Sequence, residues 1–291
     1  MNRRQILDRE SRGQRLAGFT AVAAAPLYII SVALDQSGAV PIAGLDTERY
    51  RAINDASTQL LASTLLRSLA FVALVPALLF TFRAAQARSE RVNGAMVGFV
   101  FIGPILLAVQ GIVTWIAQTQ VASDFVSQVG PSGDVYTLLD DLIDNSSIFD
   151  VASNLLFPAL LGLIVVMVYV PLQAMRVGLL SRFFATLGMA LGVSSLFIVP
   201  ALSLLALMIW FGWLGFTILD KVPKGRPPAW DAGEAIPWPK PGEQPTPAPA
   251  GGPADVVDGD ASEVFPETQA SAPDHSGRRE RAKKRKRKRR R

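Results

Sequence analysis

FFATLGMALGVSSLFIVPALSLLALMIWFGWLGFTIL, residues 183–219, is a stretch of 37 residues without a charged side chain. A helix that crosses a membrane needs about 20 apolar residues. As a single helix this stretch would be about 55 Å long, nearly twice the thickness of the hydrocarbon core, and tilt does not absorb that difference. Pro200 disfavours helix at the residue before it, so we divide the stretch into two spans, 183–199 and 201–219.

Four more apolar segments precede this stretch, and half of all residues in the chain are apolar. Each segment is long enough to cross a bilayer as a helix. We therefore predict an all-α protein, a polytopic membrane bundle of six transmembrane helices followed by a disordered C-terminal tail. The four preceding spans are expected at about residues 16–34, 60–82, 94–116 and 151–172.

Basic residues alternate between the predicted loops. The N-terminal arm, residues 1–15, carries five arginines, and the loops after the second, fourth and sixth spans are also basic. The loop at 119–150 has six aspartates and neither Lys nor Arg. Because basic loops stay in the cytoplasm, we expect a multi-pass protein of the cell membrane with both termini inside and 119–150 outside. A five-span arrangement would export the basic C-terminus and is disfavoured.

The N-terminus also has features of a cleaved signal peptide, because Arg3 and Arg4 precede an apolar run that ends in small residues. The run is 19 residues long, which exceeds a usual signal core. Asp8 and Glu10 also dilute the basic region. We favour an uncleaved first span.

The segment after the sixth span, residues 221–277, is rich in Pro, Ala and acidic residues and has few large apolar ones. Such a composition lacks the means to bury a core, so we expect a disordered linker. One part, RPPAWDAGEAIPWPKPGE at 226–243, contains Trp230 and Trp238. Tryptophan favours the lipid–water interface, so this part is expected to lie on the membrane surface. A short motif that binds a partner is the alternative.

The C-terminal tail, residues 278–291, is a polyanion-binding candidate. Its charge density predicts attraction to anionic lipid, nucleic acid or an acidic protein, without readout of a particular sequence. The alternative is a solvated tail that only reinforces the topology. Its twelve basic residues are Arg278, Arg279, Arg281, Lys283, Lys284, Arg285, Lys286, Arg287, Lys288, Arg289, Arg290 and Arg291.

Five polar residues lie in the outer third of the predicted bundle. Charges inside a membrane are costly and indicate either pairing or function. The structural interpretation is that Arg67 pairs with Asp35 or Asp150, and the functional one is a ligand site of a small transporter or sensor. The set is Asp35, Arg67, Gln110, Asp150 and Asn154.

Several chemistries are disfavoured by composition. The chain has no Cys and a single His, His275, so thiolate chemistry and HExxH-type zinc hydrolysis are excluded. Asp140, Asp141 and Asp144 match the DDxxD pattern of prenyl-diphosphate enzymes, but they also form the polar face of an amphipathic helix expected at 135–148. Gly192-Val-Ser-Ser195 lacks a His or Lys base in any span. We expect no catalytic residue, metal or cofactor and a non-enzymatic protein, with a DDxxD enzyme as a disfavoured alternative.

The C-terminal part of the chain has a distinctive layout. It begins with the motif GRPPAWDAGEAIPWP at 225–239 and continues with a Pro/Ala linker and a Lys/Arg terminus. In this layout the chain resembles uncharacterised six-span membrane proteins of actinobacteria. The resemblance covers the whole chain loosely, and only that motif is specific. It implies the six-span fold and no known activity, so it assigns no functional residue.

Overall fold

The structure is a computed structural model that describes residues 3–37, 46–129, 135–197, 200–223 and 225–239. All regular elements in these ranges are helices. They are α1 (Arg3–Ser37), α2 (Asp46–Asp55), α3 (Ser57–Arg88), η1 (Gly94–Met96), α4 (Val97–Gln128), α5 (Val135–Asp144), α6 (Ser147–Arg176), α7 (Arg182–Phe197), α8 (Pro200–Ile218) and α9 (Ala229–Ala232).

Four helices are long and apolar enough to cross a membrane: α1, α3, α6 and the continuous segment formed by η1 and α4. The helices α7 and α8 are apolar but shorter, with 16 and 19 residues. The prediction of an all-α fold with long apolar helices is therefore confirmed. The 183–219 stretch is divided where expected, because α7 ends at Phe197 and α8 begins with Pro200, a position that suits proline.

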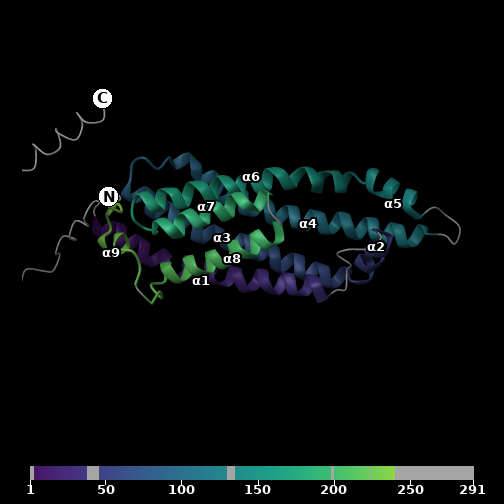
Figure 1. Ribbon diagram of the computed structural model, residues 1–291, viewed down its shortest axis with the longest axis horizontal. Helices are drawn as coiled ribbons and strands as arrows, with labels where there is room; N and C mark the ends of the chain where they lie inside the picture. Colours follow the sequence, from purple (N-terminus) through teal and green to yellow (C-terminus); the bar gives the residue numbers. More distant parts are fainter. Residues whose placement is uncertain (1–2, 38–45, 130–134, 198–199, 224, 240–291) are drawn as a thin grey trace, which may run out of the picture. The chain divides into compact units, whose positions relative to one another are not determined.

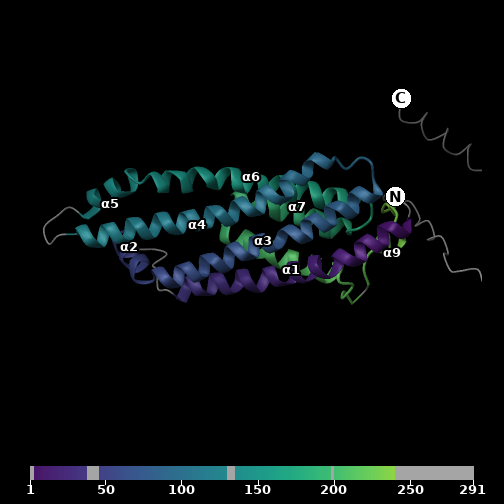
Figure 2. The same ribbon diagram turned by 180° about the vertical axis from the view of Figure 1, so that it is seen from behind.

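The long helices run alongside one another (Figure 1). α1 packs against α3 and α8, and α4 packs against α6. Seen from either side, α7 and α8 form a hairpin beside only one half of the bundle (Figures 1 and 2). We call the end where α1 begins and α3 and α6 finish the strap end. The opposite end, which carries α2 and α5, is the cap end.

Glycines allow the closest helix contacts in the bundle. A Cβ atom at Gly103 of α4 would lie 2.7 Å from the carbonyl carbon of Gly162 on α6. A Cβ at Gly215 of α8 would lie 2.7 Å from the carbonyl oxygen of Gly18 on α1. Real Cβ contacts are longer, so these backbones approach as closely as small residues permit.

The cap end has a small hydrophobic core of its own. Tyr50 of α2, Phe125 of α4 and Leu139 of α5 are buried together there. The apolar face of α5 joins this core, which confirms that the helix predicted at 135–148 is amphipathic and packs by its apolar side. The helix itself ends earlier, at Asp144.

Two helices extend far beyond their predicted spans, and one short helix lies outside all of them. α1 begins at Arg3, so the arm 1–15 is helical from that residue, and α4 continues to Gln128, far into the expected 119–150 loop. The short helix α2 was not expected. Hydropathy does not detect these turns, because they contain many polar residues, and their helical structure depends on a few apolar side chains such as Ile6 and Phe125 that pack against neighbouring helices.

Candidate functional site at the strap end of the bundle

Residues 225–239, which we call the strap, fold onto the strap end of the bundle. The expectation of a disordered linker from residue 221 is therefore wrong for this part, while residues 240–277 lie outside the described residues. Gly225 and Gly233 have φ of 73° and 64°, a left-handed conformation that suits glycine. Pro228 precedes α9 and Gly233 ends it, so the strap turns sharply at both ends of this short helix.

The two tryptophans fix the strap to the turn after α6. Trp230 is 2% exposed, and its indole nitrogen donates a hydrogen bond of 2.9 Å to the carbonyl oxygen of Leu179. Its ring stacks on Phe80 of α3, with centroids 5.7 Å apart. Trp238 donates in the same way to Leu180, at 2.8 Å. The expectation that Trp230 lies at the lipid surface is wrong, because its ring is buried in protein.

The strap also needs a glycine in the turn that it covers. Gly178 has φ of 81°. A Cβ atom there would collide with the carbonyl oxygen of Ile236. Ile236 in turn donates its backbone N–H to Val177, at 3.1 Å. A side chain at position 178 would therefore displace the strap and strain the turn.

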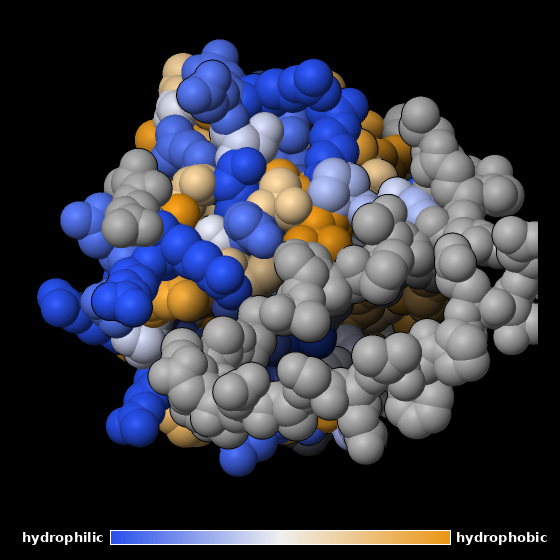
Figure 3. Space-filling model, turned by 90° about the vertical axis from the view of Figure 1, so that its left-hand side faces the viewer, coloured by the Kyte–Doolittle hydropathy of each residue, from blue (hydrophilic) through white to orange (hydrophobic). Residues whose placement is uncertain are grey.

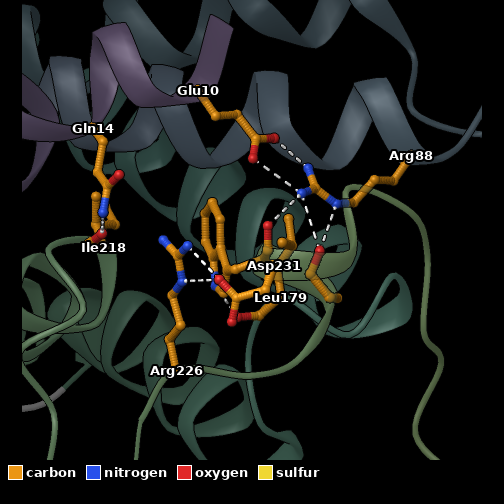
Figure 4. A network of polar contacts seen from close by, with 9 residues as sticks. Glu10, Gln14, Arg88, Leu179, Ile218, Arg226 and Asp231 are labelled. Carbon is orange, nitrogen blue, oxygen red and sulfur yellow. Dashed lines mark hydrogen bonds and ion pairs between the residues drawn. The ribbon is translucent and has the colours of Figure 1, made fainter. Parts of the chain in front are cut away.

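Arg88 connects the strap to two helices. Its side chain, in the last turn of α3, is fully buried and pairs with both carboxylate oxygens of Glu10 on α1 (Figure 4). It also donates to the carbonyl oxygen of Ala229, from Nε at 3.2 Å and from Nη2 at 3.1 Å. The guanidinium carbon lies 5.8 Å from the centroid of the Trp230 ring. One cation thus holds α1, α3 and α9 together.

Further polar contacts close the strap end. Gln14 of α1 donates to the carbonyl oxygen of Ile218 at 2.6 Å, and Arg226 pairs with Asp231 within the strap (Figure 4). Arg182, the first residue of α7, donates to the carbonyl oxygen of Pro239 at 2.7 Å. The last described residue of the strap is therefore fastened to the bundle.

The predicted polar cluster is formed only in part. Asp35 at the end of α1 accepts hydrogen bonds from Ser63 and Arg67 of α3. Of the two partners predicted for Arg67, the structure shows Asp35 and not Asp150. Ser63 was not predicted, because a lone serine in an apolar segment gives no signal.

The remaining members of that set lie apart. Gln110 donates to Thr114 of its own helix, at 2.8 Å. Asp150 and Asn154 are exposed on α6, and no hydrogen bond or ion pair within the described ranges joins them to Asp35. The structure therefore shows an ion pair with a serine, not a five-residue site.

We expect the Asp35–Arg67 pair to stabilise the bundle. Arg67→Leu should lower the free energy of unfolding by about 2 kcal/mol, because Asp35 loses its partner while both side chains are only about one-third exposed. Arg67→Leu with Asp35→Leu should recover part of that loss. The measurement is folded yield and thermal stability in detergent. A double variant no better than the worse single variant would contradict the pairing.

The sequence motifs considered for catalysis lie on α5 and within α7. Asp140, Asp141 and Asp144 are exposed on α5, and no three His, Asp or Glu side chains in the described part come together as a metal site would require. Ser194 and Ser195 donate to the carbonyl oxygens of Leu191 and Gly192 in their own helix, at 3.0 and 2.7 Å. His275 and the basic tail, 278–291, lie outside the described residues.

The strap end and the flanks of the bundle differ in surface polarity. Viewed from the strap end, the coloured residues are mostly hydrophilic (Figure 3). The flanks carry large apolar side chains, with Phe183 75% exposed and Leu16 and Phe19 64% exposed. Comparison of the chain with protein-family models, curated proteins and solved structures found no match.

Proposed function

We propose that this chain is a non-enzymatic integral membrane protein with six membrane-crossing helices. Its strap end faces the cytoplasm, and it holds its polybasic tail, 278–291, at the inner face of the membrane. The observation that carries this proposal is the strap. Pro239, the last described residue of the strap, is fastened to Arg182 at the strap end, the same end as the N-terminal arginines.

The lengths of the long helices support a membrane position. From Gln14, which contacts the end of α8, to Asp35 there are about 21 helical residues, or roughly 30 Å. Arg67 and Arg88 of α3 are separated by the same distance. Two polar levels thus lie one hydrocarbon thickness apart, and exposed apolar side chains such as Phe19 and Leu69 fill the space between them.

The shorter helices fit the same layer. α7 and α8 are about 24 and 28 Å long, close to the hydrocarbon thickness, and both begin or end near basic residues of the strap end. The cap end, with α2, α5 and the last turns of α4, then projects outside. The 119–150 segment has neither Lys nor Arg, which fits the exterior by the positive-inside rule, although α2 carries Arg49 and Arg51 at the same end.

The tail is proposed to bind anionic lipid or another polyanion at the inner face. Each basic residue near an anionic leaflet contributes roughly 1 kcal/mol, so a few engaged at once would hold the tail there.

A soluble peptide of residues 240–291 should bind vesicles that contain phosphatidylglycerol at low salt. We expect most of this binding to disappear by about 0.5 M salt, because screening shortens the field. Co-sedimentation with the vesicles measures it, and a peptide of residues 240–277 is the control. Binding that persists at high salt, or that the control peptide reproduces, would contradict a purely electrostatic tail.

A small transporter or sensor at the cap end is the second candidate. The observation that favours it is the buried Nε atom of Arg67, which has no hydrogen-bond partner among the described residues. The rest of the expected polar set lies apart from this arginine, so we place this candidate behind the first.

A further inference from the structure

A groove opens between α1 and α3 at the strap end, and no residue of the strap lines it. Its volume is about 210 Å³. Gly13 of α1 contributes no side chain and faces the ring of Phe80, which forms part of the floor. The residues that matter for its chemistry are Arg9, Gly13, Leu16, Pro76, Phe80 and Arg83.

The lining changes from charged to apolar along the groove. α1 and α3 are antiparallel, as the Glu10–Arg88 pair and the Gly13–Phe80 contact show. Arg9 and Arg83 therefore lie toward one end of the groove. Leu16 and Pro76 lie toward the other end, and Leu16 is 64% exposed on the flank of the bundle.

The two arginines have no carboxylate partner within the described part of the chain. Arg9 and Arg83 are both exposed and form no ion pair there. The one acidic residue of the lining, Glu10, is occupied by Arg88. The charged end of the groove thus offers two free guanidinium groups, which suit phosphate oxygens.

The depth of the groove matches the boundary of the hydrocarbon layer. Gln14 contacts the last residue of α8 and marks the inner end of the spans. Arg9 lies five residues beyond it along α1, about 7 Å, which is the depth of a lipid headgroup layer. Leu16 lies on the hydrocarbon side of Gln14. A ligand that fills the whole groove must therefore be charged at the cytoplasmic end and apolar at the membrane end.

We propose that this groove binds an anionic phospholipid of the inner leaflet, with its phosphate at Arg9 and Arg83 and the first part of an acyl chain against Leu16 and Pro76. This inference rests on the membrane orientation given under the proposed function. A free phosphate ion would use only the charged end, and the basic tail would be repelled by the two arginines. The volume holds only part of a lipid, as expected for a groove that is open to the bilayer.

The full chain tests this inference in nanodiscs of equal parts phosphatidylcholine and phosphatidylglycerol. Native mass spectrometry counts the lipids that stay bound on release into about 0.5 M ammonium acetate, where screening removes lipid held only by the charge of the basic tail. The test variant is Arg9→Gln with Arg83→Gln. The matched control, Arg12→Gln with Arg91→Gln, removes the same charge from α1 and from the turn just after α3, at the same end of the bundle, but not from the groove.

We expect the ratio of bound phosphatidylglycerol to bound phosphatidylcholine to fall about tenfold in the test variant and to stay unchanged in the control. Inorganic phosphate added to the unchanged chain should not displace the lipid. Equal loss in both double variants, no loss in either, or displacement by phosphate would overturn the lipid site. If the chain still shows the proposed orientation in the membrane, such a result refutes the groove alone.

Discussion

Trp230→Ala should lower the free energy of unfolding by about 3–5 kcal/mol, the range for deletion of a buried Trp side chain. The indole is 2% exposed, stacks on Phe80 and satisfies the carbonyl oxygen of Leu179. Alanine would leave a cavity at the strap end and an unpaired buried acceptor. The strap should also detach, so that a protease added to the strap side cleaves it faster than in the unchanged chain.

Circular dichroism during a reversible detergent-denaturation titration measures this change. Trp213→Ala is the matched control, because Trp213 is 51% exposed on α8 and its loss leaves no buried cavity. A loss in Trp230→Ala that is no larger than the loss in Trp213→Ala would show that the strap is not part of the folded core.

Arg88→Met should have an effect of similar size, about 3–5 kcal/mol, because it leaves Glu10 as a buried charge without its partner. The Arg88 side chain is fully buried, while that of Glu10 is 14% exposed. The substitution also removes the donors to the carbonyl oxygens of Ala229 and Ala84. Both the α1–α3 contact and the strap should therefore loosen together.

The double variant Arg88→Met with Glu10→Leu separates the two causes. Removal of both charges should recover part of the stability, while the carbonyl oxygen of Ala229 stays unsatisfied. Arg91→Met, at an exposed position just after α3, is the control and should change stability little. The contrary result is that Glu10→Leu lowers stability in the Arg88→Met background by as much as it does alone. The two residues would then not be coupled, and loss of the ion pair would not explain the destabilisation by Arg88→Met.

Much of the membrane-facing architecture could be predicted from hydropathy, because long apolar helices need no tertiary partner to be recognised. The break before Pro200 was predictable for the same local reason, the steric effect of proline on the preceding residue. The extension of α4 to Gln128 was not. Its last turns pack against Tyr50 of α2, which is distant in sequence, and against Leu139 of α5, the next helix along the chain.

The strap shows why composition alone is insufficient for a site. A segment with many Pro and Gly residues cannot form a core of its own, which is why the linker 221–277 was expected to be disordered and its tryptophan-containing part, 226–243, to lie on the membrane surface. It folds because the bundle already supplies a surface, to which Trp230 and Trp238 donate hydrogen bonds. A pair of tryptophans within such a segment was the available signal.

The two ion pairs that join α1 to α3 differ in how readily the sequence predicts them. Arg67 lies in an apolar segment, where an unpaired charge is costly, so a partner at the level of Asp35 was predictable. Glu10 and Arg88 lie in segments that already contain several charges. Their alignment depends on the relative position of α1 and α3, which local sequence does not specify.

The orientation of the bundle in the membrane is the central claim, and single-cysteine labelling tests it most directly because the chain has no native cysteine. Asp140→Cys lies at an exposed position of α5 in the cap, and Glu234→Cys lies at an exposed position of the strap. In intact cells a membrane-impermeant maleimide should label position 140 at once and position 234 only after the membrane is permeabilised. Labelling of position 234 from outside, or protection of position 140, would contradict the account.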